Sequence, residues 1–181
     1  DQTTTYSNFN NGNFNTGNFN FWTHSGNVVA GGNFVAFNGS DATPNGVISQ
    51  SISTVNGQSY TFGGDVIRIG GGAGTVQLKL DVIDNVTSAV IATQTLTAVS
   101  GTAAFSQSFT GNGNDFTIKF TDISAATVNV DIGLDNLALT PNPTTVGTNY
   151  LNSASAIIWD TTTNAGYNNN IAGIARDDAS G

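Results

Sequence analysis

The 181 residues of this chain include no cysteine, no methionine and no glutamate, and only three prolines. Without cysteine the chain can form neither a disulfide nor a thiolate metal site. No apolar run approaches the length of a transmembrane helix, and Ala156–Trp159 is typical of the longest. We therefore expect no insertion into a membrane.

Charged residues are also scarce, at 9% of the chain, and the twelve acidic ones are all aspartates. The cations are Arg68, Lys79, Lys119 and Arg176, which leaves a net charge of −8 and an isoelectric point near 4.1. Such a chain repels other polyanions, so neither nucleic acid nor an anionic membrane surface is an expected partner. Scattered aspartates can instead collect hard cations, above all Ca²⁺.

Asparagine, threonine, serine and glycine take the place of charge, and they favour turns and strands over helix interiors. Alternating apolar and polar runs predict strands at 33–38, 46–55, 58–69, 75–84, 88–98, 103–110, 114–122 and 127–140. This spacing predicts an all-β fold for residues 1–143, a two-sheet antiparallel β-sandwich or jelly roll. Residues 144–181 follow Pro141-Asn142-Pro143 as a C-terminal extension, which we expect to dock on the sandwich or on a neighbouring subunit.

The N-terminal part of the chain repeats phenylalanine every five residues, at Phe9, Phe14 and Phe19. A five-residue period is one sign of a β-solenoid, but three units are too few to bury a continuous core. The alternative is a looped first strand whose aromatic residues anchor the edge of the sandwich. We favour this second interpretation.

Catalytic residues are hard to find, and we expect the protein not to be an enzyme. His24 is the only histidine, and the sequence offers it neither an orienting partner nor a nucleophile in a recognised motif. A glycosidase needs a carboxylate pair, but Asp81 and Asp84 lie at the end of a polar strand and are interpreted as solvated. The glycine-rich run 70–74 lacks the downstream helix of a phosphate-binding loop and is interpreted as a hairpin loop.

One aspartate has an unexpected position in the last predicted strand. The apolar residues between 128 and 134 occupy even positions, whereas Leu137 and Leu139 occupy odd ones. The phase therefore slips near residues 133–136, as at a β-bulge, and Asp135 takes the parity of the two leucines. We expect its carboxylate to point toward the end of the core, where a buried charge needs Ca²⁺ or backbone amides of the first strand.

Three parts of the sequence resemble the carbohydrate-binding-module-like jelly rolls of the galactose-binding-like superfamily, which is common in secreted bacterial proteins. They are Asn11-Gly12-Asn13-Phe14-Asn15 with Gly17-Asn18-Phe19 and Trp22-Thr23, then Gly46–Ile52 with Gly57–Phe62, and the closing Val130–Leu137. The resemblance covers roughly residues 8–140 and implies the jelly-roll fold. It also implies a structural Ca²⁺ between the acidic residue after the Gly-Asn-Phe motif and the aspartate of the closing motif.

Carried over to this chain, the resemblance places the ion between Asn15 and Asp135, with Asp131 of the closing motif as a further candidate ligand. Asn15 stands where the family usually has glutamate, which removes one charge from the site. The tail has a resemblance of its own, because Ile158-Trp159-Asp160 and Tyr167–Gly181 look like a segment of large bacterial surface proteins. It implies that the chain is cut from a longer surface protein.

Two functions are consistent with these patterns, and both place the chain outside the cell, secreted or on the cell surface, where a processed chain starting at Asp1 would be found. The main prediction is a non-enzymatic structural or adhesive subunit that associates with itself in a filament or matrix. Strand contacts would order its polar termini, through Thr3, Thr4, Thr5, Tyr6, Ile157, Ile158 and Trp159. The alternative is a Ca²⁺-stabilised carbohydrate-binding module of a larger secreted protein, which contacts polysaccharide through Trp22, His24 and Tyr60.

Overall fold

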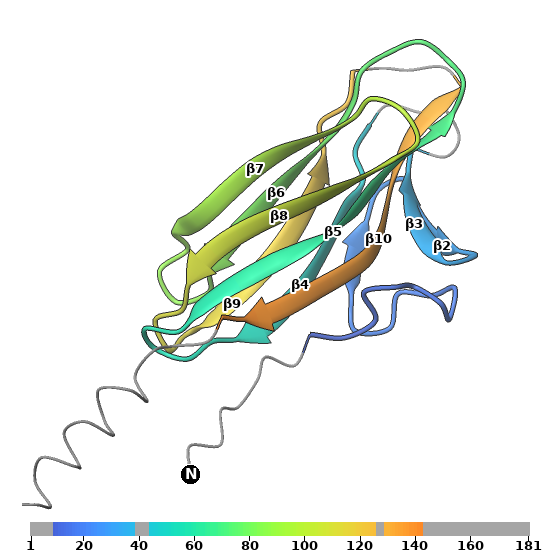
Figure 1. Ribbon diagram of the computed structural model, residues 1–181. Helices are drawn as coiled ribbons and strands as arrows, with labels where there is room; N and C mark the ends of the chain where they lie inside the picture. Colours follow the sequence, from blue (N-terminus) through green and yellow to red (C-terminus); the bar gives the residue numbers. More distant parts are fainter. Residues whose placement is uncertain (1–8, 39–43, 126–128, 143–181) are drawn as a thin grey trace, which may run out of the picture. The chain divides into compact units, whose positions relative to one another are not determined.

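The computed structural model describes residues 9–38, 44–125 and 129–142, which form ten β-strands and no helix. The strands are β1 (Thr23–Ser25), β2 (Val28–Gly31), β3 (Phe34–Phe37), β4 (Val47–Ser53), β5 (Ser59–Gly70), β6 (Val76–Asp84), β7 (Val90–Ala98), β8 (Thr102–Thr110), β9 (Asp115–Asp122) and β10 (Val130–Pro141). Sheet A has the order β1-β4-β9-β6-β7, and sheet B has the order β2-β3-β10-β5-β8 (Figure 1). The predicted antiparallel β-sandwich is confirmed.

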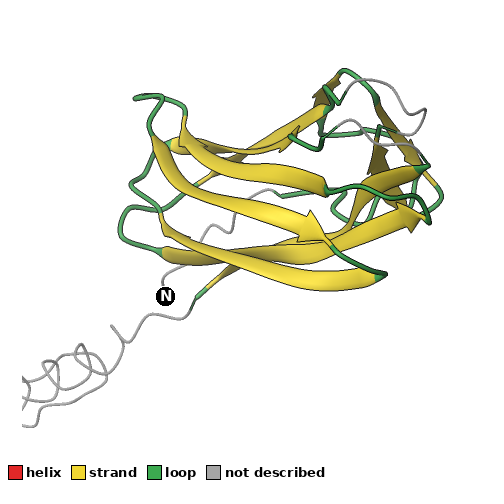
Figure 2. Cartoon of the chain, turned by 90° about the horizontal axis from the view of Figure 1, so that it is seen from above, coloured by secondary structure: helices red, strands yellow, loops and turns green. Residues whose placement is uncertain are grey.

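The core lies between the two sheets, because the strands alternate buried and outward-facing residues. In β9, Phe116, Ile118 and Phe120 are buried while the residues between them lie on the outer face of sheet A. Figure 2 shows the described part of the chain as strands and loops only. The largest fully buried side chains come from both sheets and from the N-terminal loop: Tyr60, Phe14, Phe37, Phe62, Phe116, Phe120, Ile48, Ile52, Leu78, Leu80, Ile118 and Ile132.

All eight predicted strands are present, with ends that differ from the prediction by a few residues. β1 and β2 were not predicted, because three and four residues are too few to show an alternating period. The phenylalanine repeat forms a loop over residues 9–22 rather than a solenoid. Phe14 is buried in the core, and Phe9 and Phe19 pack against it, so the repeat anchors the sandwich as we interpreted.

The chain divides into two units between Asn142 and Pro143, and the structure describes only the first. The C-terminal extension therefore lies outside the described residues. So do the residues predicted to mediate assembly, which are Thr3, Thr4, Thr5, Tyr6, Ile157, Ile158 and Trp159. In the described part of the chain, no helix has the length and apolar character needed to cross a membrane.

Candidate functional site

Two of the three aromatic residues predicted to contact sugar are buried. Trp22 is 6% exposed, and its Nε1 donates a hydrogen bond to O of Asn11 at 3.0 Å. Tyr60 is 1% exposed, and its hydroxyl accepts a hydrogen bond from N of Val55 at 2.9 Å. Both rings pack in the core, and neither has a face open to solvent. The expectation that Trp22 and Tyr60 are exposed as sugar contacts is therefore wrong.

His24 is the member of that predicted set that the structure leaves exposed. It lies in β1, at the edge of sheet A, and its imidazole stacks on the ring of Phe19 with 4.0 Å between ring centroids. The two rings are tilted by 24°. Phe19 and His24 thus form a stacked aromatic pair that joins the N-terminal loop to β1.

Phe21 is an exposed aromatic residue that was not among the predicted sugar contacts. Its side chain is 69% exposed, and its backbone φ of 73° lies in the left-handed region. Such a conformation costs a bulky residue about 1–3 kcal/mol and persists where the surrounding structure fixes it, often at binding sites. The sequence held one signal, because Phe21 falls outside the five-residue period of Phe9, Phe14 and Phe19.

We call residues 9–22 the aromatic loop, and a network of asparagine side chains holds it in shape. Asn11 is in the left-handed region at φ 52°, and its Nδ2 donates to O of Asn18 at 3.0 Å and to O of Asn20 at 3.1 Å. The loop is also tied to β10, because N of Leu137 donates to O of Gly12 at 2.9 Å. The bonds from Asn11 fix the backbone on both sides of Phe19 and directly before Phe21.

A second anchor joins the aromatic loop to sheet A through Gln50, a polar residue on the buried face of β4. Its Oε1 accepts a hydrogen bond from N of Asn10 at 2.8 Å, and its Nε2 donates to O of Asn10 at 2.9 Å. Gln50 thus satisfies both main-chain groups of one loop residue, in the manner of a sheet partner.

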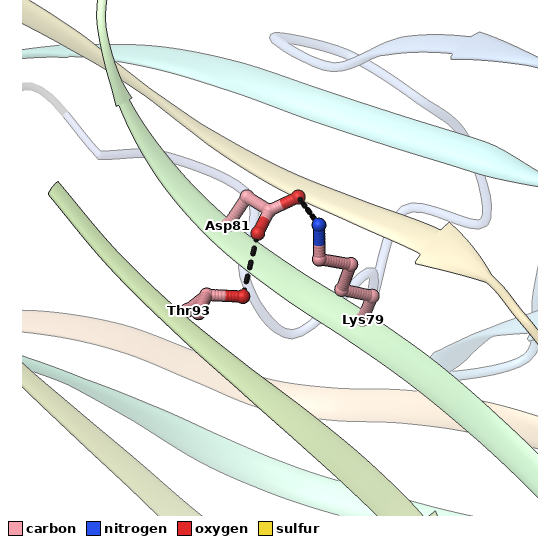
Figure 3. Close-up of polar contacts among 3 residues, drawn as sticks. All are labelled: Lys79, Asp81 and Thr93. Atoms are coloured by element: carbon pink, nitrogen blue, oxygen red, sulfur yellow. Dashed lines mark hydrogen bonds and ion pairs between the residues drawn. The ribbon is translucent and has the colours of Figure 1, made fainter. Parts of the chain in front are cut away.

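The two aspartates interpreted as solvated are both buried. Asp81, 7% exposed, receives Lys79 Nζ at 3.0 Å and a hydrogen bond from Thr93 Oγ1 at 2.7 Å on the outer face of sheet A (Figure 3). Lys119 of β9 lies opposite it across the strands. Asp81 therefore has a lysine and a hydroxyl as partners, and the interpretation as a solvated carboxylate is wrong.

Asp84 is a structural clamp between the β6–β7 hairpin turn and the loop that connects β8 of sheet B to β9 of sheet A. Its carboxylate accepts hydrogen bonds from Asn112 and Asn114 side chains at 2.8–3.1 Å and from N of Val86 and Thr87 at 2.8 and 3.2 Å. The bond from Asn112, followed by those from Asn114 and the backbone, lowers the pKa of Asp84 far below its usual range, although burial opposes the shift. A carboxylate held ionised in this way is unsuited to act as a general acid.

The β-bulge in β10 lies where the sequence predicted it, but Asp135 faces the other way. The register with β5 shifts between residues 135 and 138, so the slip begins after Asp135. Leu137 is buried, whereas Asp135 is half-buried and lies opposite Asp65 on the outer face of sheet B. Its Oδ1 accepts a hydrogen bond from N of Asn136 at 2.7 Å. The expectation of a carboxylate pointing into the core is therefore wrong.

The three candidate calcium ligands do not fit one site. Asp131 and Asp135 lie four residues apart on one strand, which is about 13 Å along it. Calcium binds its oxygen ligands at about 2.3–2.6 Å, so two aspartates at that spacing cannot reach the same ion. Asn15 is exposed in the aromatic loop, and the described residues contain no group of three or more His, Cys, Asp or Glu that could hold a metal. Calcium binding at Asp135 stays a prediction, with Asp65 as the carboxylate opposite.

Comparison with solved structures shows which fold this chain has. The chain is similar to a CBM4 structure, with a TM-score of 0.55 and 14% identity over 74% of this chain and 99% of that one. It is also similar to TmCBM61 in complex with β-1,4-galactotriose, with a TM-score of 0.57 and 17% identity over 74% and 97% of the two chains. A third is the N-terminal cellulose-binding domain of a β-1,4-glucanase C from Cellulomonas fimi, with a TM-score of 0.52 and 15% identity over 68% and 90%. The chain therefore has the β-sandwich jelly-roll fold of carbohydrate-binding modules, which the sequence resemblance implied.

Comparison of the sequence adds one match. A family model described as a domain of unknown function (DUF8202) matches residues 134–181, the end of β10 and the chain beyond it. No curated protein matches the sequence.

Proposed function

We propose that this chain is a non-enzymatic carbohydrate-binding module that acts outside the cell and binds polysaccharide through the aromatic loop and β1. The observation that carries the proposal is Phe21, an aromatic ring 69% exposed on a strained backbone. Sugar rings have faces made of C–H groups, which pack against exposed aromatic rings, while their hydroxyls need polar partners. The exposed Asn20 next to Phe21, and His24 stacked on Phe19, supply such partners.

The fold supports this proposal over the self-associating filament subunit that was the main prediction from the sequence. Its structural neighbours include a cellulose-binding domain and a module in complex with β-1,4-galactotriose. The terminal segments on which the filament prediction depended lie outside the described residues. Net charge −8 and the absence of a carboxylate pair suited to acid–base work in the described site are consistent with a neutral glycan bound without chemistry.

Binding to cello-oligosaccharides and to β-1,4-galacto-oligosaccharides, measured by isothermal titration calorimetry, tests the proposal. We expect Phe21→Ala to weaken binding about tenfold or more, because truncation of a central aromatic contact costs about 2 kcal/mol. The matched control is Val86→Ala, which truncates a side chain that is 73% exposed in the β6–β7 turn. Equal affinities for Phe21→Ala and wild type, or silence of the wild type on a broad glycan array, would contradict the proposal.

A further inference from the structure

The four edge strands of the sandwich are protected to very different degrees. On one side of the sandwich, β1 and β2 are three and four residues long. On the other side, β7 and β8 are nine residues long and lie next to each other (Figure 1). Proteins usually shield long edges with short strands, charged residues, proline or bulges, because an open edge is a template for strand pairing.

Of the two long edges, β7 is interrupted and β8 is regular. The register between β6 and β7 shifts at Val82 and Ile83, which leaves Ile91 as an extra residue in β7. The register between β5 and β8 runs without a shift from Ser59↔Thr110 to Ile67↔Thr102. β8 has no proline, and no charged residue occurs anywhere from 85 to 114. Among the residues that the structure describes, β8 is therefore a long edge strand without charge, proline or bulge.

The hydrogen bonds between β8 and the neighbouring strand β5, with the residues that flank them, show which main-chain groups β8 presents at its open edge. N of Arg68 donates to O of Gly101 at 2.7 Å, and N of Gly111 donates to O of Gln58 at 2.8 Å. Hydrogen-bonded residues alternate in an antiparallel pair, so the odd-numbered residues of β8 face β5. The even-numbered residues turn their N–H and C=O groups to the open edge, and all of them are exposed: Thr102, Ala104, Ser106, Ser108 and Thr110.

We propose that β8 pairs with β8 of a second copy of this chain, antiparallel and about a two-fold axis at Ser106, so that two copies of sheet B become continuous. This inference goes beyond glycan binding and does not depend on it. The sequence of β8 is nearly self-complementary about Ser106, since Thr102 meets Thr110 and Ala104 meets Ser108 of the second copy. These outer-face side chains are small and uncharged, so two chains of net charge −8 meet without like charges across the new ladder.

The absence of cysteine allows a direct test of the register with single-cysteine variants of the full chain. In an antiparallel hydrogen-bonded pair, opposite Cα atoms are about 5.5 Å apart, so Ser106→Cys brings two thiols within reach of a short thiol-specific crosslinker. In Ala104→Cys, the two cysteines are separated by four residues, about 13 Å along the strand, and are not bridged. The third variant, Val86→Cys, places an exposed thiol in the β6–β7 turn, outside β8, and reports random collisions. We expect dimers of Ser106→Cys alone, and equal crosslinking of all three would overturn the proposal.

Sedimentation equilibrium of the full chain tests the pairing itself. Wild type is expected to dimerise with concentration, and Ser106→Lys, which places two ammonium groups opposite each other, is expected to raise the dimer dissociation constant at least about tenfold. Val86→Lys adds the same charge at the β6–β7 turn and should leave that constant within about twofold. A wild type that stays monomeric at all concentrations, or a dimer that Ser106→Lys does not weaken, overturns the proposal. Glycan binding by such a monomer would show that the proposed function stands without the pairing.

Discussion

Replacing Gln50 by leucine tests whether the aromatic loop depends on its bond to sheet A. Leucine has a similar volume and fits between Ile48 and Ile52 on the buried face of β4. It removes both hydrogen bonds to Asn10, at 2.8 and 2.9 Å, and changes nothing else in the loop. The variant therefore isolates the anchor from the packing.

The expected loss in the free energy of unfolding follows from the two hydrogen bonds between Gln50 and Asn10. A hydrogen bond contributes about 0.5–1.5 kcal/mol net, and a main-chain group left without a partner costs about 1–3 kcal/mol when it is buried. Asn10 is exposed, so water replaces part of what Gln50 supplied, and the lower range applies to each bond. We expect Gln50→Leu to lower the free energy of unfolding by about 1–3 kcal/mol for the pair.

Urea unfolding followed by tryptophan fluorescence measures this loss, because Trp22 packs inside the loop against Phe9 and Phe14. Gln77→Leu is the control, since Gln77 Nε2 donates to Thr97 Oγ1 on the outer face of sheet A, and we expect a change in the free energy of unfolding below about 0.5 kcal/mol. Gln50→Leu should also weaken glycan binding without touching the ligand. A Gln50→Leu variant as stable as wild type, or a control that loses as much, would contradict the anchoring role of Gln50.

Three further variants probe other parts of the structure. An alanine Cβ at Gly12 would clash with O of Leu137, so Gly12→Ala should lower the free energy of unfolding in urea by about 1–3 kcal/mol. Gly31→Ala is the control and should be neutral, because a Cβ at Gly31 meets nothing within 4 Å. Equal losses in the two variants would contradict the contact between the aromatic loop and β10. Because its pKa is lowered on folding, ionised Asp84 stabilises the fold above the usual carboxyl pKa and loses this effect as pH falls through the folded value. The thermal midpoint of wild type should therefore fall more steeply below about pH 4 than that of Asp84→Asn. Asp65→Asn should raise stability in EDTA by about 0.2–1 kcal/mol by relieving repulsion with Asp135. Added Ca²⁺ should raise the thermal midpoint of wild type but not that of Asp65→Asn. A wild-type midpoint that does not change with Ca²⁺ would contradict calcium binding at Asp135.

The strands could be predicted from the sequence because a period of two depends only on the chain itself. Val76, Leu78, Leu80 and Val82 show it in β6, and all are buried. β1 and β2 escaped prediction because their pairing is set by the partners β4 and β3 rather than by their own three and four residues. The same limit applies to Asp135. The phase slip was visible in the sequence, but which residue begins the bulge depends on the register with β5.

The candidate site was harder to predict, because exposure is decided by contacts between distant segments. Trp22 and Tyr60 are the kind of residue that sugar-binding surfaces use, yet their polar atoms find main-chain partners in the core at Asn11 and Val55. Phe21 lies outside the period of Phe9, Phe14 and Phe19, but the sequence does not show whether its ring is buried or exposed. Only the loop backbone, fixed by Asn11 and Gln50, turns its ring to solvent.

The two proposals combine into a prediction about long polysaccharides. The aromatic loop leads into β1, at one edge of sheet A, whereas β8 is on the β7 side of the sandwich. Pairing through β8 therefore leaves the loop of each copy free, and a dimer would carry two glycan sites. Two linked sites raise the apparent affinity for a long polymer but not for a short oligosaccharide, since only the polymer can occupy both.

Ser106→Lys separates these effects, because it changes the dimer edge and leaves Phe21 untouched. We expect it to weaken retention on an immobilised polysaccharide by about a hundredfold or more and to leave the affinity for a trisaccharide unchanged, since the second site acts through effective concentration. Phe21→Ala should weaken both. Equal loss of polymer and trisaccharide binding in Ser106→Lys would mean that the β8 edge itself contacts the sugar, and the division between a pairing edge and a binding loop would be wrong.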